Sequence, residues 1–382
     1  MVGPELYLFE PRKTFMPVTQ DQVLAALKHV QDPDLHRDIV ELGFVKNLII
    51  DGGSIRFDVE LTTPACPVKE ELKGQCEHMV KALPGVTEVA VNMTAQAPKG
   101  VGGKRTELLA SVRHILAVAS GKGGVGKSTA TANLAMALAQ TGAKVGVLDA
   151  DIYGPSMSLM FGVHTAPEIN EKQKLIPVSV QGIKLVSMAM FADDEKPVVW
   201  RGPMVSQMIQ NFVHNVVWGE LDYLLIDMPP GTGDVQLTLT QSAPLSGSVI
   251  ITTPQDVSVL DAKKGLKMFQ KVSVPVLGII ENMSYFICDN CEKRHHIFRQ
   301  GGGRRISESL GVPFLGEIPI EPGVAESGDA GVPMVVRKPD SISTAAYRRI
   351  AGSIAASLSI LTAEMGDVMG EFDLKWEELQ EI

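Results

Sequence analysis

Two short stretches of this 382-residue chain carry residues whose types and spacing could do chemistry. The first is Gly121-Lys122-Gly123-Gly124-Val125-Gly126-Lys127-Ser128-Thr129, which satisfies the pattern G-x-x-x-x-G-K-[ST]. Glycines allow backbone N–H groups to surround a phosphate, and the N-terminus of a following helix adds a favourable dipole. We expect Lys127 to reach the β- and γ-phosphates and the Ser128 hydroxyl to bind Mg²⁺.

The second stretch is the C-x-x-C pair Cys288 and Cys291, which is followed by His295 and His296. Two thiolates at this spacing can hold one metal ion or one edge of a cluster, but a four-ligand site needs two more ligands. Three completions are open: zinc with the two histidines, a dithiol–disulfide pair without metal, or a Cys₄ site to which two chains each give two cysteines. The zinc option requires tighter spacing than is usual.

Carboxylates at the ends of two apolar runs are expected to complete the phosphate site. Asp149 and Asp151 end the run that begins at Lys144, and Asp227 ends the run that begins at Tyr223. Ligands of open parallel sheets gather at the carboxyl ends of the strands, where these side chains would lie. Helix N-capping is the structural alternative for the aspartates, and without the phosphate loop it would be favoured for Asp149, which we expect to bind the nucleotide.

The elements that must position these residues are apolar strands alternating with helices. Continuous apolar runs are typical of strands buried on both faces of a parallel sheet. A helix is expected over Ser128–Gln140, with its alanines and leucines on one face. The pattern predicts an α/β fold with a mostly parallel sheet, whose strands are expected at 114–120, 144–150, 223–229, 248–254, 274–280 and 312–318.

Composition divides the chain into four parts. Residues 18–94 predict a small α/β domain, and residues 95–110, which are rich in glycine and basic side chains, predict a linker. Residues 111–361 form the predicted P-loop domain, and residues 362–382 an acidic tail.

The overall composition excludes several classes of protein. The chain is 45% hydrophobic with a net charge of −9, so it has no global attraction for nucleic acid or anionic lipid. It has no uninterrupted apolar run long enough to span a bilayer and no signal-peptide pattern, so we expect a reduced, cytoplasmic location. Four cysteines in this length cannot form the disulfide framework of a small secreted domain.

The other two cysteines lie in the predicted first domain. Cys66 stands between two prolines at an expected helix start, where the helix dipole favours a thiolate, although a buried, inert thiol is the alternative. If Cys66 and Cys76 share one helix, the rise between them is about 15 Å. A disulfide requires Cα atoms within about 7 Å, so the two should not pair.

The second lysine of the phosphate loop, Lys122, gives the motif a resemblance to the deviant Walker A ATPases of the SIMIBI type. This group includes MinD, ParA, the nitrogenase iron protein and the arsenite-pump ATPase. The resemblance implies that Lys122 reaches across a nucleotide-sandwich homodimer to the partner's phosphates. It also implies that Asp151 orients the attacking water, that Asp227 holds Mg²⁺ through water, and that Asn282 contacts adenine.

A narrower resemblance covers nearly all of residues 111–361. The segments GKGGVGKST, VLDADIYGPS, IDMPPGTGD and IENMSYFICDNC…HHIF…GGG together resemble the Mrp/ApbC iron–sulfur cluster carriers. That resemblance implies a homodimer that binds a bridging [4Fe–4S] cluster through Cys288 and Cys291 and binds and slowly hydrolyses ATP. It implies scaffold proteins and apo iron–sulfur proteins as partners, without nucleic acid or membrane. Ala325 departs from the family, because many relatives have an arginine nearby.

The first domain has a resemblance of its own. DPDLHRDIVELGFV and LTTPACPVKEEL are similar to the small domain attached to cytosolic and SUF-type iron–sulfur assembly factors. This resemblance implies that Cys66 is reactive or related to the cluster.

Three other functions remain open from the sequence. A MinD- or ParA-like positioning ATPase would share the phosphate loop but would need a basic amphipathic tail or a basic patch. An ATP-driven redox protein would keep its cluster and cycle electrons. A zinc-stabilised scaffold would contain zinc in place of iron.

Overall fold

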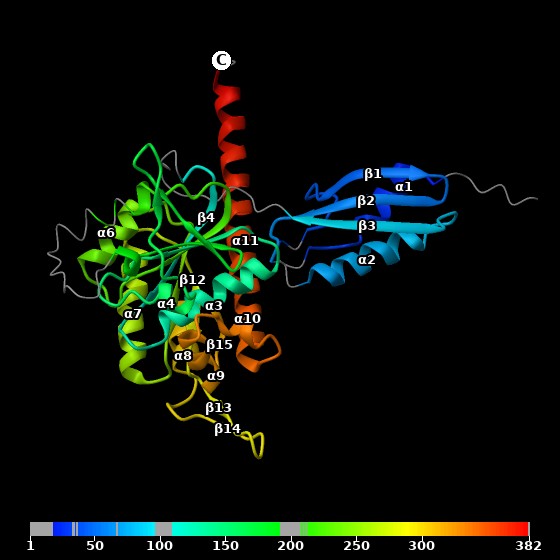
Figure 1. The fold of residues 1–382 in the computed structure, drawn as a ribbon. Helices are drawn as coiled ribbons and strands as arrows, with labels where there is room; N and C mark the ends of the chain where they lie inside the picture. The colour runs from blue at the N-terminus through cyan, green and yellow to red at the C-terminus, as the bar shows by residue number, and fades with distance from the viewer. Residues whose placement is uncertain are drawn as a thin grey trace, which may run out of the picture. The chain divides into compact units, whose positions relative to one another are not determined.

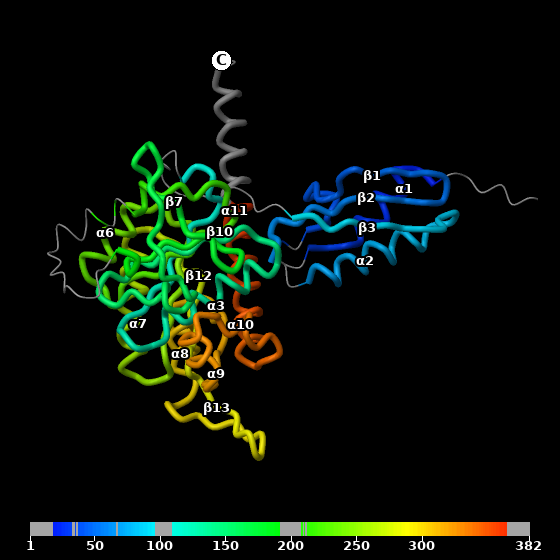
Figure 2. Tube along the Cα trace, viewed as in Figure 1, coloured from blue at the N-terminus to red at the C-terminus, as the bar shows by residue number. Residues whose placement is uncertain are grey.

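The computed structural model describes residues 18–32, 35, 37–65, 68–95, 109–191, 208, 210 and 212–380, with side chains up to residue 364 in the last helix. The chain divides into two compact units, Met1–Leu61 with Val68–Gln96, and Thr62–Pro67 with Ala97–Ile382. Cys66 and most of the predicted linker lie outside the described residues. Figures 1 and 2 show the elements of each unit.

The first unit is a three-stranded sheet with two helices. Strands β1 and β2 form the antiparallel hairpin that the Asp-Gly-Gly turn predicts, and Gly52 has a left-handed φ of 57° there. Strand β3 then pairs in parallel with β2, which a helix between them permits. The elements are α1 (Gln20–Leu27), β1 (Val45–Asp51), β2 (Ser54–Leu61), α2 (Lys69–Lys81) and β3 (Glu88–Ala95).

The second unit is built on an eight-stranded sheet in the order β15-β12-β11-β4-β10-β5-β9-β8. All neighbouring strands pair in parallel except β8, which pairs antiparallel with β9 at one edge. The strands are β4 (Val112–Ser120), β5 (Val145–Asp149), β8 (Val178–Val180), β9 (Ile183–Ser187), β10 (Leu221–Asp227), β11 (Gly247–Thr252), β12 (Val276–Glu281) and β15 (Phe314–Glu317).

Helices cover both faces of this sheet (Figure 1). In β4, Leu116 and Val118 face the core that includes α3 (Lys127–Gln140) and α11 (Ile342–Gln380). Ala117 alternates with them and faces a second core, which includes α7 (Asp256–Lys271) and α8 (Gly302–Leu310). A strand with apolar side chains on both faces reads as one continuous apolar run, and the predicted α/β class with a mostly parallel sheet is confirmed.

A small antiparallel hairpin projects from the second unit (Figures 1 and 2). It consists of β13 (Phe286–Ile287) and β14 (Arg294–His295), and it carries the C-x-x-C pair between them. The remaining elements are α4 (Met157–Met160), β6 (Glu168–Ile169), β7 (Leu175–Ile176), the 3₁₀ helix η1 (Met188–Phe191), α6 (Asp234–Ser242), α9 (Pro322–Asp329) and α10 (Met334–Arg337).

Helix α11 runs through the position where the sequence predicts the acidic tail to begin. The helix continues without a break from Ile342 to Gln380, so residues 342–361 and most of 362–382 form one element. Its first part packs on α3 and β15. Among the described helices, none has both the length and the apolar composition that crossing a bilayer requires.

Candidate nucleotide and metal site

The phosphate loop lies between β4 and α3, at the carboxyl end of the sheet. Strand β4 ends at Ser120, and α3 begins at Lys127 after Gly126, whose φ of 80° favours glycine. Gly121 is required for a different reason: a Cβ there would lie 2.1 Å from the backbone carbonyl carbon of Asp261 in α7. The glycines therefore serve both the curvature of the loop and its close approach to a neighbouring helix.

The loop encloses a cavity of about 260 Å³. Lys122 and Thr129 line it together with glycines of the loop, while Val125 is buried beneath. The lining residues are Ser120, Lys122, Gly123, Gly124, Gly126, Lys127, Ser128, Thr129, Asp151, Gly154, Ser156, Met160 and Pro230.

Lys127 and two aspartates form a charged cluster beside this cavity. The Lys127 ammonium lies 2.7 Å from Asp227 Oδ2 and 3.6 Å from Asp151 Oδ2. Lys127 is 6% exposed, Asp151 is 7% exposed and Asp227 is fully buried, so the attraction is little screened by water. The structure thus brings together the lysine and both of the aspartates that the sequence assigns to catalysis and magnesium binding.

The hydroxyls of α3 complete the surroundings of Asp227. Ser128 Oγ donates to Asp227 Oδ2 at 2.6 Å, and Thr131 Oγ1 donates to Asp227 Oδ1 at 2.8 Å. A serine hydroxyl and a carboxylate are the hard oxygen donors that Mg²⁺ accepts beside nucleotide phosphates. The donor set at Ser128 and Asp227 therefore fits the magnesium ion that the motif requires.

Asp149 serves the structure of the neighbouring loop and does not line the cavity. Its Oδ2 accepts hydrogen bonds from the Ser187 hydroxyl and the backbone N–H groups of Ser156 and Met157, and its Oδ1 accepts from the N–H of Asp151. Burial, together with the nearby charge of Asp227, raises the pKa of Asp149 to about 7. These hydrogen bonds hold the segment that leads into α4, whose N-cap residue is Ser156, and the assignment of Asp149 to the nucleotide stays a prediction.

Asn282 lies under the phosphate loop. Its Nδ2 donates to the Val125 carbonyl at 2.8 Å, and the side chain is 7% exposed. A Cβ on Gly126 would lie 2.3 Å from the same Nδ2. The described contact of Asn282 supports the loop, and the assignment to adenine stays a prediction.

Cys288 and Cys291 lie in the turn of the β13–β14 hairpin, where Cys291 is exposed. The turn is closed by the Cys288 N–H donating to the Lys293 carbonyl and by the Glu292 N–H donating to the Cys288 carbonyl. Hydrogen bonds from the backbone of Asn290 and Cys291 hold the pKa of the Cys288 thiol below its usual value. A thiolate stabilised by backbone donors in a projecting turn is suited to ligate a metal.

The two histidines do not join the cysteines. His295 is in β14, paired with Phe286, and His296 Nδ1 lies 3.3 Å from the Ser284 carbonyl oxygen at the base of the hairpin. Within the part of the chain that the structure describes, no three histidine, cysteine or acidic side chains gather as a metal site would require. One chain therefore supplies two thiol ligands at this hairpin, and the zinc alternative with both histidines is not supported by the geometry.

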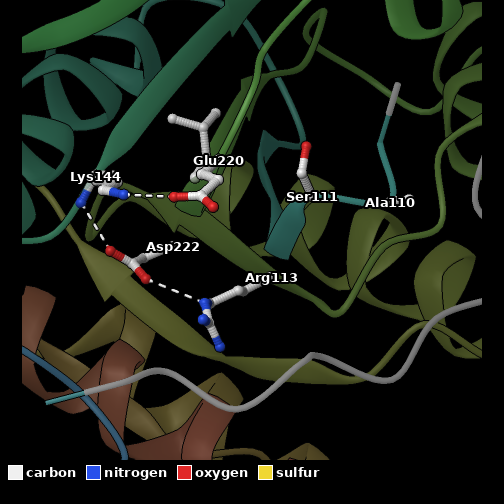
Figure 3. A pocket seen from close by; sticks show the side chains of 7 residues that line it. Ala110, Ser111, Arg113, Lys144, Glu220 and Asp222 are labelled. Carbon is white, nitrogen blue, oxygen red and sulfur yellow. Dashed lines mark hydrogen bonds and ion pairs between the residues drawn. The ribbon is translucent and has the colours of Figure 1, made fainter. Parts of the chain in front are cut away.

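A second cavity, of about 420 Å³, is lined by residues at the starts of β4, β5 and β10, at the end of the sheet opposite the phosphate loop. Figure 3 shows its charged side chains. Its charged side chains pair with one another: Lys144 Nζ lies 2.7 Å from Glu220 Oε2, and Arg113 Nε lies 3.4 Å from Asp222 Oδ1. These residues precede or begin their strands, whereas ligands of open α/β sheets bind at the carboxyl ends. The phosphate loop is thus the better candidate for the site.

The sequence did not predict several residues of the site. Gly154, Ser156 and Met160 line the cavity from the segment after β5, and Pro230 lines it from the segment after β10. Thr131 follows Ser128 by three positions on α3, and this spacing places both hydroxyls on one face of the helix. That spacing is a signal the sequence offers in advance, and Gly154, Ser156 and Pro230 lie inside the quoted motifs VLDADIYGPS and IDMPPGTGD, whereas Met160 has no such signal.

The fold and the site define a P-loop NTPase. A MinD cell-division ATPase from Pyrococcus furiosus shares the fold, at a TM-score of 0.50 and 24% identity over 63% of this chain and 98% of that one. A nucleotide-binding protein from Archaeoglobus fulgidus, solved in complex with ADP and with cobalt, is 41% identical at a TM-score of 0.53, over 59% of this chain and 89% of that one.

Within that class, residues 111–355 match the family described as NUBPL iron-transfer P-loop NTPase, and the chain belongs to this family. Residues 20–91 match a second family, described as iron-sulfur cluster assembly protein. A relative from Synechocystis named iron-sulfur cluster carrier protein is 51% identical over 90% of this chain and 99% of its own length. The sequence-based resemblance to iron–sulfur carriers of the Mrp/ApbC kind is confirmed.

Proposed function

We propose that the chain binds a [4Fe–4S] cluster and transfers it to apo iron–sulfur proteins, with ATP binding and hydrolysis coupled to this cycle. The observation that carries the proposal is the pairing of a formed P-loop site with an exposed C-x-x-C turn in one folded unit. The name of the Synechocystis relative supports the same function. The cluster is cargo here, so the turn must present its thiols to solvent and to partners.

The proposal includes a homodimer. Each chain supplies Cys288 and Cys291, and a [4Fe–4S] cluster takes four cysteine thiolates, so two chains complete one site. Lys122 lines the phosphate cavity with its side chain partly exposed, as a lysine that serves a partner's nucleotide must be. Two separate features thus favour the same two-fold arrangement.

In the proposed hydrolysis, this chain's residues have distinct tasks. Lys127 and Lys122 would offset the negative charge that gathers on the γ-phosphate oxygens in the transition state. Asp151, 3.6 Å from the Lys127 ammonium, would orient the attacking water. Ser128 and Asp227 would hold Mg²⁺, which neutralises the β- and γ-phosphate oxygens.

The test is anaerobic reconstitution with iron and sulfide, followed by measurement of bound iron, bound sulfide and visible absorption. We expect the wild-type chain to take up a cluster and Cys288→Ala to lose it. Cys76→Ala is the matched control, because Cys76 is a buried cysteine in the first unit. Full iron and sulfide content in Cys288→Ala would show that the ligand assignment is wrong, and zinc in place of iron would favour the scaffold alternative.

A further inference from the structure

Glu281, the last residue of β12, is a fully buried carboxylate outside the charged cluster of the nucleotide site. Its Oε1 accepts a hydrogen bond from the Ser284 hydroxyl at 2.6 Å, and its Oε2 accepts one from the backbone N–H of Gly303 at 2.5 Å. Burying a carboxylate is costly unless its oxygens are hydrogen-bonded, and both oxygens are used here. The two hydrogen bonds that offset the burial of Glu281 also hold their donors, Ser284 and Gly303, in place.

Those two donors stand at the two ends of the segment that carries the cysteines. Ser284 precedes β13, and Gly303 is the second residue of α8, which follows β14. A Cβ on Gly303 would lie 3.1 Å from the Glu281 Cβ, so glycine permits the close approach of α8. Glu281 therefore closes the base of the segment 284–303, which we call the cysteine hairpin segment.

The next residue along the chain contacts the phosphate loop. Asn282 donates from Nδ2 to the Val125 carbonyl at 2.8 Å, and its own N–H donates to the Thr252 carbonyl at 2.8 Å. Two adjacent side chains at the end of β12 thus contact two different parts of the fold: Asn282 the phosphate loop, and Glu281 the two ends of the cysteine hairpin segment. A displacement of Val125 on nucleotide binding would be transmitted through the backbone of this strand end to Glu281.

We propose that Glu281 is a positioning residue that couples the phosphate loop to the cysteine hairpin segment. Nucleotide bound at the loop shifts Asn282, and Glu281 converts that shift into a change in how firmly Ser284 and Gly303 are held. The purpose of the coupling rests on the proposed cluster-carrying function. The coupling itself is a property of the polypeptide, so it can be measured without a cluster.

The experiment is hydrogen–deuterium exchange on the full chain, with and without Mg²⁺ and a saturating non-hydrolysable ATP analogue. In the wild type we expect the analogue to change exchange at residues 284–303 as well as at the loop. Glu281→Gln keeps the shape of the side chain but removes its charge and one accepting oxygen, so the bond from the Gly303 N–H is lost or passes to a weaker, uncharged acceptor. Exchange at Gly303 should rise by about five- to tenfold, as expected for one lost hydrogen bond, and the response of the segment to the analogue should disappear.

Two further variants keep the result interpretable. Ser284→Ala removes one donor and leaves the carboxylate in place, so it should weaken the response even if Glu281→Gln folds poorly. Glu321→Gln is the matched control, because Glu321 also accepts from a backbone N–H, that of Ser343 at 3.2 Å, away from the hairpin. It should leave the response of residues 284–303 unchanged.

Two outcomes would overturn the coupling: a wild-type segment that does not respond to the analogue, or an undiminished response in Glu281→Gln while the loop amides still show protection by the analogue. The cluster is assayed separately on the same preparations. A wild-type chain that shows the coupled exchange but takes up no iron and sulfide would contradict the proposed function and leave the coupling standing. Cluster uptake without coupled exchange would support the proposed function and contradict the coupling.

Discussion

At the scale of single residues, the site depends on carboxylates with different surroundings. Asp227 lies 2.7 Å from the Lys127 ammonium and accepts from two hydroxyls, whereas Asp149 accepts hydrogen bonds from neutral donors only and feels the charges of Asp227 and Lys127 without a direct ion pair. Neutral donors offset the cost of burying a charge less fully than a cation does. The two aspartates are close in the fold but differ in the free-energy cost of burying their negative charge.

This difference predicts how the stability of the protein depends on pH. The pKa of Asp149 is about 7 in the folded chain against 3.8 for the unperturbed group, so the folded state binds more protons between these values. The free energy of unfolding should therefore fall as pH rises through this window, by up to ~1.4 kcal/mol per pH unit. In Asp149→Asn this contribution is absent.

Denaturant titrations of both proteins between pH 5 and pH 7.5 check this prediction. The stability difference should move in favour of Asp149→Asn as the pH rises. Two parallel pH profiles would contradict it.

The residue types alone predict the phosphate loop and the C-x-x-C pair, since each chemistry needs a fixed spacing. The partners of these residues could not be predicted in the same way. Glu281 and Ser284 are three positions apart at the end of β12. This spacing predicts their hydrogen bond only if the residue at which the strand ends is already known. The hydrogen bond from the Ser187 hydroxyl in β9 to Asp149 likewise joins residues that are far apart in the sequence.

At the scale of elements, the packing of β4 against α7 sets the position of the loop. Gly121 leaves no room for a side chain, because the backbone of Asp261 in α7 occupies the space. We expect Gly121→Ala to lower the free energy of unfolding by about 1–3 kcal/mol or more, since the obstacle is rigid backbone. It should also weaken nucleotide binding, because relief of the clash must move the loop.

The matched control for this prediction lies in α7 itself. A Cβ on Gly265 would meet nothing within 4 Å, so Gly265→Ala should be neutral or stabilise the helix by about 0.5–1 kcal/mol. Denaturant unfolding measures both variants. Equal stability of Gly121→Ala and the wild type would show that β4 and α7 separate more easily than the structure indicates.

Periodicity predicts the long strands well and the short elements poorly. The central strands are apolar over their whole length, so a simple apolar run identifies them. The hairpin strands β13 and β14 have two residues each, and no pattern exists over so short a length. The continuity of α11 across residue 361 has no signal in the apolar pattern, because the acidic residues after 361 differ in composition from the apolar first part of the helix.

At the scale of the whole molecule, two features predict which partners the chain binds. The net charge predicts no binding to an anionic membrane, whereas Lys122 predicts binding to a second copy of the chain. With a net charge of −9, the chain should not sediment with anionic liposomes in the presence of ATP and Mg²⁺. Co-sedimentation that salt abolishes would instead favour a positioning ATPase. A protein of established membrane binding serves as the positive control.

A second copy of the chain is the expected partner. Light scattering with a non-hydrolysable ATP analogue should show a dimer for the wild type and a weaker dimer for Lys122→Ala. ATP turnover of Lys122→Ala should fall by at least about tenfold, since a cation that meets the γ-phosphate in the transition state is lost. Lys263→Ala, a lysine of α7 outside the lining of the phosphate cavity, is the charge-matched control. Unchanged turnover in Lys122→Ala would contradict the proposed sandwich arrangement.

The side chains of β4 point alternately into two cores, and this limits the insertions and deletions that the strand can tolerate. Leu116 and Val118 face one helix layer while Ala117 and Ala119 face the other, and the phosphate loop follows directly. Inserting or deleting one residue inside this strand would exchange the two sets of side chains between layers and turn the loop to the opposite side of the sheet. Lineages of this protein should therefore accept substitutions along β4 but almost never a change in its length.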